Sequence, residues 1–544
     1  MSLHPDHTPH TPEAYFERYA DKTPTGKKLE VTSSLLQRAL ALYLFSQMTK
    51  PQRTLKVNDR FARMIPEGED GVKVPGMVMS VSPEMLTLIR LLDYLHGEKV
   101  NQATDVLGWL AALILPSGPL HRSLIKGLYK GFGPSEVQHH LETHHLDILQ
   151  RTAEQLDKKI KENGGKIRVD LMHQPVKQLY TESIHSFLVP DIESSDISNL
   201  AKLMVELGER MGEYLLTVIK QEKSPAFLHN KIGATENDVK QHFSRVNQVI
   251  GDLKTTHFDP IIKGYLKDVN AGVFTGEGKD GVLRKMVRYF LTETRREEGQ
   301  VQYQRTSEKI EKIREEVVAL IINQGKVDLK VLEHYQHQSD EDFIVEAMES
   351  FLTSVIFAGQ DTVTMLTTNA VLIANANPTI LANCRQEILQ ALGLSEGQRI
   401  SREQFMELLG EQSQSFPYLE ALLTESLRLR PPVDNLIRSF QNEDGPIHIR
   451  YGGNDFKGGT LNVLIGPMQR RPEHFVKPHR AEPNRHLSDE VIKAAGYNWT
   501  EASPNVVAYR QQYNMAAYAP FGAKARNQEP REISGAGNAR NCPG

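Results

Sequence analysis

Two neighbouring side chains, Asp361 and Thr362, have the chemistry needed to move protons within an apolar segment. They follow Gly359 and Gln360 in a stretch that is otherwise rich in Ala, Val, Ile, Leu and Phe. A carboxylate can accept and release a proton, and an adjacent hydroxyl can donate and accept hydrogen bonds, so the two residues could present polar groups to a ligand. In the middle of a helix, Gly359 would cost on the order of 1 kcal/mol relative to Ala. The glycine therefore either serves packing or marks a distorted turn that opens room for a ligand.

Cysteines, which can bind metals or act as nucleophiles, are few. The only cysteines are Cys384 and Cys542, which excludes a disulfide framework and a cysteine-ligated iron–sulfur cluster and suits a reducing compartment. His140 and His144 are four residues apart on an expected helix, a spacing that can hold zinc. The segment lacks the His-Glu-x-x-His order of a metalloprotease, so we expect these histidines to face solvent.

The composition is that of an ordinary soluble protein. The chain has 544 residues, 39% apolar residues and a formal net charge of −4, which argues against a nucleic-acid binder that works by bulk charge. The best apolar candidate, Ala39–Phe45, is seven residues long, well short of the roughly 20 that a membrane-spanning helix needs. No signal pattern opens the sequence, and residues 1–28, rich in Pro, Thr, His and Lys, are typical of a poorly ordered tail. We expect no membrane span and a cytoplasmic location.

A helical spacing of apolar residues dominates from Leu35 onward. The longest such segment begins at Asp340 and runs to Asn377, with Pro378 as the stop. It is apolar on most sides, which indicates a helix buried in the middle of the molecule. The acid–alcohol pair lies on this helix.

A second clear helix is expected from Tyr418 to Arg430, with Glu425 and Arg428 on one face because they are three residues apart. Further helices are expected at 120–131, 135–163, 196–221 and 235–251, a strand at 76–81, and one or two hairpins at 446–466. The charge-dense segment 279–325 is expected to be solvated helix surface. The sequence thus predicts a mainly α fold with a small β portion.

Several short motifs follow one another in a fixed order. They are Ala358-Gly-Gln-Asp-Thr362, Glu425-Ser-Leu-Arg428, Arg438, Arg471-Pro-Glu-His-Phe475, Pro483-Asn-Arg485 and Arg540-Asn-Cys542-Pro-Gly544. In this order and spacing, the sequence resembles the cytochrome P450 family, the haem-thiolate monooxygenases. The clear resemblance covers residues 340–544, and a weaker one reaches back through Gly118-Pro-Leu-His121 to Ser82-Pro-Glu84. It implies a single helical domain of that family over residues 29–544.

The resemblance implies a haem b (heme b) cofactor whose iron is bound by the thiolate of Cys542. A thiolate ligand pushes electron density towards the iron and favours cleavage of the O–O bond. Arg540, Arg438 and His121 resemble residues that pair with the haem propionates, and Arg suits such carboxylates because its guanidinium forms charge-assisted hydrogen bonds. Gly359 matches the position that lets oxygen fit beside the long helix.

The resemblance also assigns roles to two groups of polar residues. Asp361 and Thr362 match the acid–alcohol pair that delivers the two protons needed to release water from dioxygen. Glu425, Arg428 and Arg485 match a buried salt-bridge cluster that is structural, because buried charges must be paired.

The haem-binding loop departs from the family pattern Phe-Gly-x-Gly-x-Arg-x-Cys-x-Gly. The residues before Cys542 lack the Phe, whereas Phe521-Gly522 fits the pattern in register but puts Gln528 at the cysteine position. Either about a dozen residues are inserted before Cys542, or the ligand position has become Gln528 and the thiolate is lost. We favour the insertion, because Arg-Asn-Cys-Pro-Gly is the better local match. Only Pro543 and Gly544 follow the cysteine, so we expect a domain truncated just after it.

The resemblance predicts a haem-thiolate monooxygenase, an oxidoreductase that inserts one oxygen atom from O2 into a small apolar organic substrate. No dinucleotide fingerprint stands out, so electrons would come from a separate ferredoxin or reductase. Peroxide-driven oxygenation or hydroperoxide rearrangement is one alternative, because branches with those activities also lengthen the loop, although they usually lack the Asp-Thr pair. A degenerate, haem-free scaffold that acts by binding is the alternative from another class.

Overall fold

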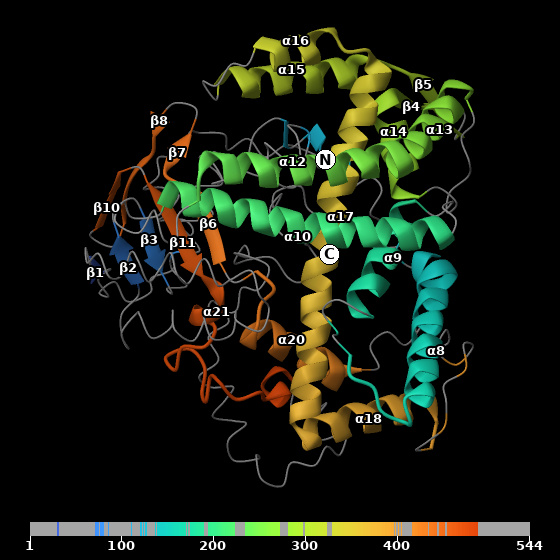
Figure 1. Ribbon diagram of the computed structural model, residues 1–544, viewed down its shortest axis with the longest axis vertical. Helices are drawn as coiled ribbons and strands as arrows, with labels where there is room; N and C mark the ends of the chain where they lie inside the picture. Colours follow the sequence, from blue (N-terminus) through green and yellow to red (C-terminus); the bar gives the residue numbers. More distant parts are fainter. Residues whose placement is uncertain are drawn as a thin grey trace. The chain divides into compact units, whose positions relative to one another are not determined.

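The computed structural model of the chain describes, with gaps, residues 30–31, 71–85, 110–127, 137–171, 175–189, 194–223, 234–272, 281–323, 329–395, 398–404 and 416–487. The chain forms two compact units, residues 1–100 with 365–544 (unit 1) and residues 101–364 (unit 2). Most residues in the described elements are helical (Figure 1), which confirms the mainly α fold with a small β portion.

The described part of unit 2 contains helices and a β-hairpin. Its helices are η1 (Leu141–His145), α8 (Leu146–Glu162), α9 (Val176–Leu188), α10 (Ser194–Lys223), α12 (Glu236–Leu253), η3 (Lys254–Phe258), α13 (Asp259–Asn270), α14 (Val282–Leu291), α15 (Glu308–Asn323), α16 (Leu329–His337) and the first part of α17 (Asp340–Ala376). The helices predicted at 135–163, 196–221 and 235–251 are confirmed by η1 with α8, by α10 and by α12.

The long helix α17 begins and ends where the sequence indicates. At its start, the Ser339 hydroxyl accepts a hydrogen bond from the backbone N–H of Asp342 at 3.1 Å, and acidic residues in the first turn favour the positive end of the helix dipole. At its end, Pro378 opens the next helix, α18 (Pro378–Leu392). The predicted helix from Asp340 to Asn377 therefore agrees with the structure to within one residue.

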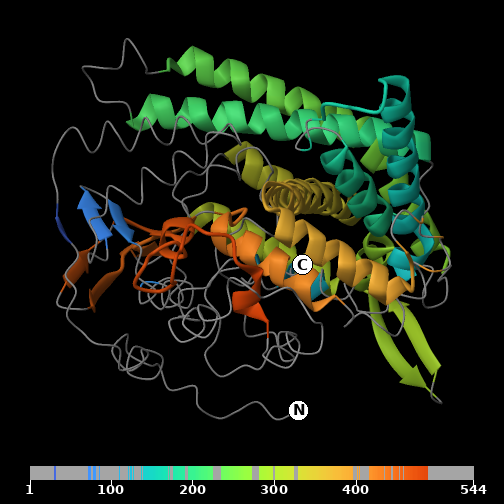
Figure 2. The same ribbon diagram turned by 90° about the horizontal axis from the view of Figure 1, so that it is seen from below.

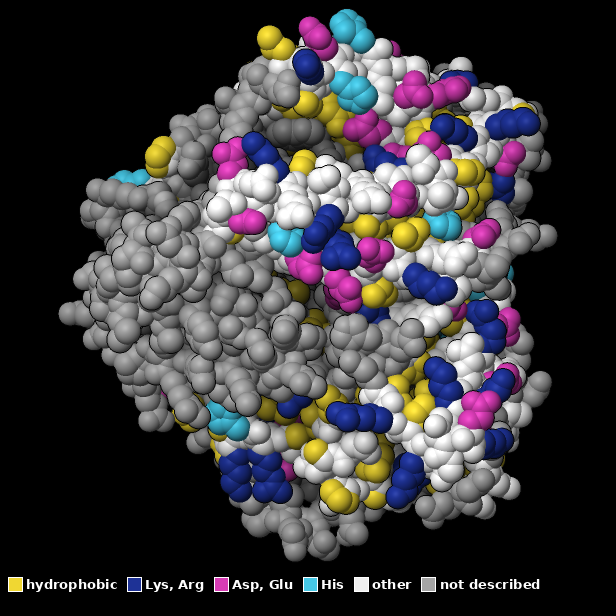
Figure 3. Space-filling view, in the orientation of Figure 1, with side chains coloured by type: hydrophobic (Ala, Val, Ile, Leu, Met, Phe, Trp, Pro, Cys, Tyr) yellow, Lys and Arg dark blue, Asp and Glu magenta, His cyan; other side chains and the backbone are white. Residues whose placement is uncertain are grey.

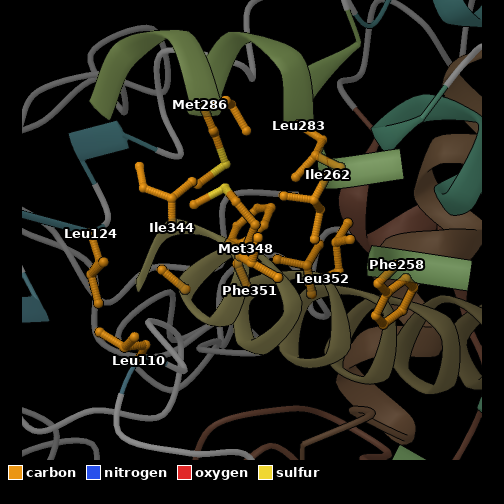
Figure 4. Close-up of a cluster of buried hydrophobic side chains, with 14 of the residues drawn as sticks. Leu110, Leu124, Phe258, Ile262, Leu283, Met286, Ile344, Met348, Phe351 and Leu352 are labelled. Carbon is orange, nitrogen blue, oxygen red and sulfur yellow. The ribbon is translucent and has the colours of Figure 1, made fainter. Parts of the chain in front are cut away.

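The core of unit 2 surrounds the N-terminal half of α17. Figure 4 shows Met348, Phe351 and Leu352 of α17 next to Ile262 of α13 and Met286 of α14. These five side chains are at most 2% exposed. Complete burial of such a side chain stabilises the fold by about 1.5–3 kcal/mol, so this packing holds the N-terminal half of α17 in place.

Helices α10 and α12 lie side by side and turn polar faces outward. Figure 3 shows side chains of both charge signs mixed over their visible surface. Arg210 of α10 forms ion pairs with Glu206 and Glu213 of the same helix. These exposed pairs each contribute little to stability. The packing of the buried side of α10 against the core therefore stabilises this helix more than its ion pairs do.

The segment 279–325 is not helical throughout, so the prediction of a solvated helix surface is wrong for its middle part. Strands β4 (Thr292–Glu297) and β5 (Gln300–Arg305) form an antiparallel hairpin, and Figure 2 shows it extending away from the helices. Charge density marks solvent exposure in either secondary structure. Thr292, Thr294, Val301 and Tyr303 are residue types that favour strands, and the pairing of β4 with β5 stabilises the hairpin.

Unit 1 contains a five-stranded sheet in the order β1-β2-β3-β11-β6. Its strands are β1 (Glu30–Val31), β2 (Gly71–Val74), β3 (Met77–Ser80), β11 (Thr460–Leu464) and β6 (Asn435–Ser439). Strand β11 pairs parallel with β3 and antiparallel with β6. The predicted strand at 76–81 and the hairpin within 446–466 are confirmed by β3 and by β9 (His448–Tyr451) with β10 (Asn454–Lys457).

The remaining elements of unit 1 are two longer helices and several short elements. They are α18, α20 (Pro417–Leu429), α21 (Ile465–Met468), η4 (Pro483–His486), and the two-residue strands β7 (Gln441–Asn442) and β8 (Gly445–Pro446). Helix α20 matches the helix predicted from Tyr418 to Arg430. Among the residues with described positions, no helix combines the length and the apolarity needed to cross a membrane. The tail at 1–28 lies outside the described residues, and a single domain over 29–544 stays a prediction.

Candidate active site

The hydroxyl of Thr362 is anchored to its own helix. Its Oγ1 donates to the carbonyl of Ala358 at 2.9 Å and lies 3.3 Å from the carbonyl of Gly359. Ala358 is exposed and Thr362 is half-buried, so both lie on the more open side of α17. The hydrogen bond fixes the rotamer of Thr362 and leaves the lone pairs of its oxygen free to accept from a water or another donor.

Asp361 is held by a lysine from another helix. Its Oδ1 lies 2.8 Å from Nζ of Lys177, which belongs to α9. The lysine side chain is 10% exposed and the aspartate side chain 45% exposed. The pair therefore keeps contact with water, and its energetic contribution is smaller than that of a fully buried pair. Its main effect is to fix where the carboxylate sits.

Gly359 has a packing role in the structure. A Cβ built at this position would lie 2.9 Å from Cδ1 of Ile184 on α9, closer than carbon atoms normally approach. The missing side chain thus lets α9 approach α17. The prediction that Gly359 contributes to cofactor binding stays a prediction.

Glu425 of α20 is the centre of a fully buried charge cluster. Both of its oxygens bind Arg428 at 2.8 Å, and Oε1 also accepts from Arg485 at 3.1 Å. The backbone N–H of Glu482 donates to Oε1 of Glu425 at 2.9 Å, and Nε2 of His486 lies 2.8 Å from Oε2. Burial alone would raise the pKa of Glu425, but the charges and hydrogen bonds of its partners outweigh it and hold the pKa at about 2.

The geometry brings together the three residues predicted for this cluster. Arg428 and Arg485 share the carboxylate of Glu425, as the sequence led us to expect. The sequence reasoning missed His486, which directly follows Arg485 and reaches Oε2 of the same carboxylate. The sequence did offer a signal, because His486 directly follows Arg485, which was already assigned to the carboxylate of Glu425.

The other predicted residues are placed only in part. Arg438 lies on β6 opposite Leu461 of β11 and is buried, and its guanidinium donates to the carbonyl of Ile437 at 2.7 Å. His121 is buried in unit 2. Two further predictions, Arg540 and Cys542, lie outside the described residues, as does the alternative position, Gln528. The haem-binding roles of Arg438, His121, Arg540 and Cys542 stay predictions.

Cys384, the other cysteine, is packed inside unit 1. It is 6% exposed and belongs to the apolar cluster between α18 and α20 that includes Ile380 and Tyr418. Burial raises the pKa of its thiol to about 11. A thiol in this environment stays protonated near neutral pH, so it is a poor metal ligand.

The expectation that His140 faces solvent is wrong. His140 is 8% exposed, its ring packs 5.2 Å from the ring of Phe187, and its Nε2 lies 3.2 Å from the hydroxyl of Ser183. His145 contacts the same hydroxyl at 2.6 Å. The expectation fails because α9 covers this side of the helix. No metal-binding group of three or more His, Cys, Asp or Glu side chains occurs among the residues searched, which are those the structure describes.

Three comparisons relate the sequence to known proteins. The family model described as Cytochrome P450 matches residues 180–527, more than half of the chain. The match includes α9 from residue 180 onward, α17 and the Glu425 cluster, and it stops one residue before Gln528.

Individual relatives match shorter segments. Cytochrome P450 93B2 of Gerbera hybrida is 28% identical over 176 residues, which are 32% of this chain and 29% of the relative. Cytochrome P450 4d8 of Drosophila melanogaster is 29% identical over 147 residues, 27% of this chain and 29% of the relative. The matched part thus spans less than a third of each relative's length. Among solved structures, retinoic acid bound cyanobacterial CYP120A1 aligns with a TM-score of 0.47 and 17% identity over 86% of this chain and 78% of its own.

Proposed function

The chain belongs to the cytochrome P450 family, and from that premise we propose that it is a haem-thiolate monooxygenase. Its reaction would insert one atom of O2 into a C–H bond of a small apolar organic molecule. Two electrons and two protons would convert the other oxygen atom to water. The observation that carries the proposal is the acid–alcohol pair of α17, in which the hydroxyl of Thr362 and the carboxylate of Asp361 each have a fixed partner.

Two of the residues that the family resemblance assigns to haem binding have side chains of suitable chemistry. Arg438 and His121 are buried, and a buried guanidinium or imidazole N–H suits the carboxylate of a propionate. Arg540 would add a further cation. The buried, protonated thiol of Cys384 does not suit an iron ligand. Because the sequence has only two cysteines, we assign the ligand role to Cys542.

When bound, haem with a thiolate ligand supplies the reduction of dioxygen and the cleavage of its O–O bond. The protein supplies protons. The carboxylate of Asp361 is accessible to water and can take up a proton from solvent. The hydroxyl of Thr362, fixed on the Ala358 carbonyl, can hold the water or hydrogen bond through which that proton passes. Lys177 keeps the carboxylate from turning away.

An isotope experiment tests this function. The chain is loaded with haem and supplied with NADPH, a surrogate ferredoxin and its reductase, under ¹⁸O2, with dodecanoic acid and 7-ethoxycoumarin as apolar probes. We expect hydroxylated dodecanoic acid that carries one ¹⁸O atom, or O-dealkylated coumarin, only when the electron donor is present. The haem-loaded chain could form neither product, whether it is supplied with O2 and the electron donor or with an organic hydroperoxide. That result would contradict an oxygenase function for these probes.

Peroxide-driven oxygenation is the second candidate. It is supported by the sequence of the haem-binding loop, in which the family match stops before Gln528 and the cysteine follows only later. In this reaction an organic hydroperoxide gives one oxygen atom to the substrate and leaves as the alcohol. Product formation from cumene hydroperoxide, with none from O2 and the electron donor, would favour this candidate.

The electron-transfer partner is part of the same proposal. A separate ferredoxin or reductase would supply electrons. The cytoplasmic location also stays a prediction, which fractionation of cells that express the chain can test.

A further inference from the structure

Gln360 lies in the middle of the acid–alcohol motif but faces away from its open side. A helix turns about 100° per residue, so Gln360 and Thr362 point in directions about 200° apart. Gln360 is 0% exposed, whereas Ala358 is exposed and Thr362 half-buried. The polar amide of Gln360 is therefore buried on the side of α17 that meets the rest of unit 2.

The amide of Gln360 bonds to two other helices. Its Oε1 accepts from the hydroxyl of Thr181 on α9 at 2.9 Å, and its Nε2 donates to the carbonyl of Met204 on α10 at 3.2 Å. The hydroxyl of Thr181 also lies 2.8 Å from the carbonyl of Lys177. A donor and an acceptor on one side chain thus have separate partners, and a buried amide without them would cost about 1–3 kcal/mol.

Gly208 of α10 faces the polar groups of α9 and α17 at this point. A Cβ built at Gly208 of α10 would lie 3.7 Å from Nε2 of Gln360 and 3.8 Å from both Oδ2 of Asp361 and Nζ of Lys177. The hydrogen bonds of Gln360 join α17 to α9 and α10, and the ion pair of Asp361 joins α17 to α9 at the next residue.

We infer that Gln360 is a positioning residue, which sets the rotation of α17 and thereby the placement of Asp361 and Thr362. Side-chain tips lie about 5 Å from a helix axis, so a rotation of about 20° would move them by about 2 Å. A misplacement of 1 Å can cost roughly 10²-fold in rate. This role rests on the proposed function, because it matters only if the pair delivers protons.

The test uses the haem-loaded chain and two readouts. Gln360→Leu removes both hydrogen bonds, and Thr181→Val removes one of them from the other side with little change in shape. Ser354→Ala is the matched control, because its buried hydroxyl donates only to Phe351 of the same helix, at 2.9 Å. The first readout is amide hydrogen exchange of the peptide that covers residues 357–366. The second is the fraction of consumed O2 released as hydrogen peroxide, measured with NADPH, a surrogate ferredoxin pair and dodecanoic acid.

We expect Gln360→Leu and Thr181→Val to speed exchange in this peptide at least about tenfold and to raise the peroxide fraction, as Thr362→Ala should. Ser354→Ala should change neither. Unchanged exchange in both variants would overturn the inference, and so would faster exchange with an unchanged peroxide fraction, which would show a purely structural role. If Gln360→Leu fails to fold, Thr181→Val decides alone. A wild-type chain that binds no haem would instead contradict the proposed function.

Discussion

Replacement of His185 by Phe is expected to make the protein less sensitive to acid. His185 lies on α9, is 0% exposed, and has no hydrogen-bond partner at either ring nitrogen. Its ring stacks on that of Phe258 with 6.4 Å between centroids. Burial and the nearby His257 lower the pKa of His185 to about 3, so the folded protein keeps the imidazole neutral where the unfolded chain would protonate it.

The sign and size of the effect follow from this pKa. Between pH 6.5 and pH 3 the unfolded chain binds a proton at this site that the folded protein does not, so the free energy of unfolding falls as the pH falls. At pH 5 the loss amounts to about 2 kcal/mol, and above pH 7 it vanishes. His185→Phe removes this term. Any packing change that the larger ring causes is the same at both pH values and cancels in the comparison.

Urea unfolding followed by circular dichroism measures the effect. The stability of His185→Phe relative to the wild type should be about 2 kcal/mol more favourable at pH 5 than at pH 8. His337→Phe offers a control, because it removes an imidazole from an exposed position on α16. An equal difference at pH 5 and pH 8 for His185→Phe would refute the assignment of a buried, neutral imidazole.

Three further predictions follow from single contacts. Glu425→Gln should lower the free energy of unfolding by about 3–5 kcal/mol in denaturant titrations, because it leaves two buried guanidinium groups without their carboxylate. Gly212→Ala should raise the melting temperature, since nothing lies within 4 Å of a Cβ there, whereas Gly393→Ala should lower it, since its φ of +61° disfavours a side chain. Lys177→Met should raise the fraction of consumed O2 that the haem-loaded chain releases as hydrogen peroxide. Lys177→Arg can still form an ion pair with Asp361, so its peroxide fraction should rise less.

Local signals in the sequence were enough to place the long helix. Acidic residues at Asp340 and a proline at Pro378 mark its ends, and both signals act through the backbone of the helix itself. The charged run at Arg295 and Arg296 gave no such guidance. Charge reports exposure, and the choice between helix and hairpin depended on the pairing of β4 with β5.

The candidate site could be predicted only where its residues are close in sequence. Asp361 and Thr362 are adjacent and lie on one helix, and Glu425 and Arg428 are three residues apart. The partners of Asp361 and Gln360 are distant: Thr181 lies 179 residues before Gln360. Only the tertiary fold brings such residues together, and no spacing rule within the sequence reports it.

We propose above all that Cys542 binds haem iron as a thiolate. A carbon monoxide difference spectrum of the reduced, haem-loaded chain tests it most directly, with Cys542→Ser and Cys384→Ser as a matched pair of variants. We expect a strongly red-shifted Soret band in the wild type and in Cys384→Ser, and its loss in Cys542→Ser. A haem band without that shift in the wild type, a shifted band that survives in Cys542→Ser, or no bound haem would contradict it.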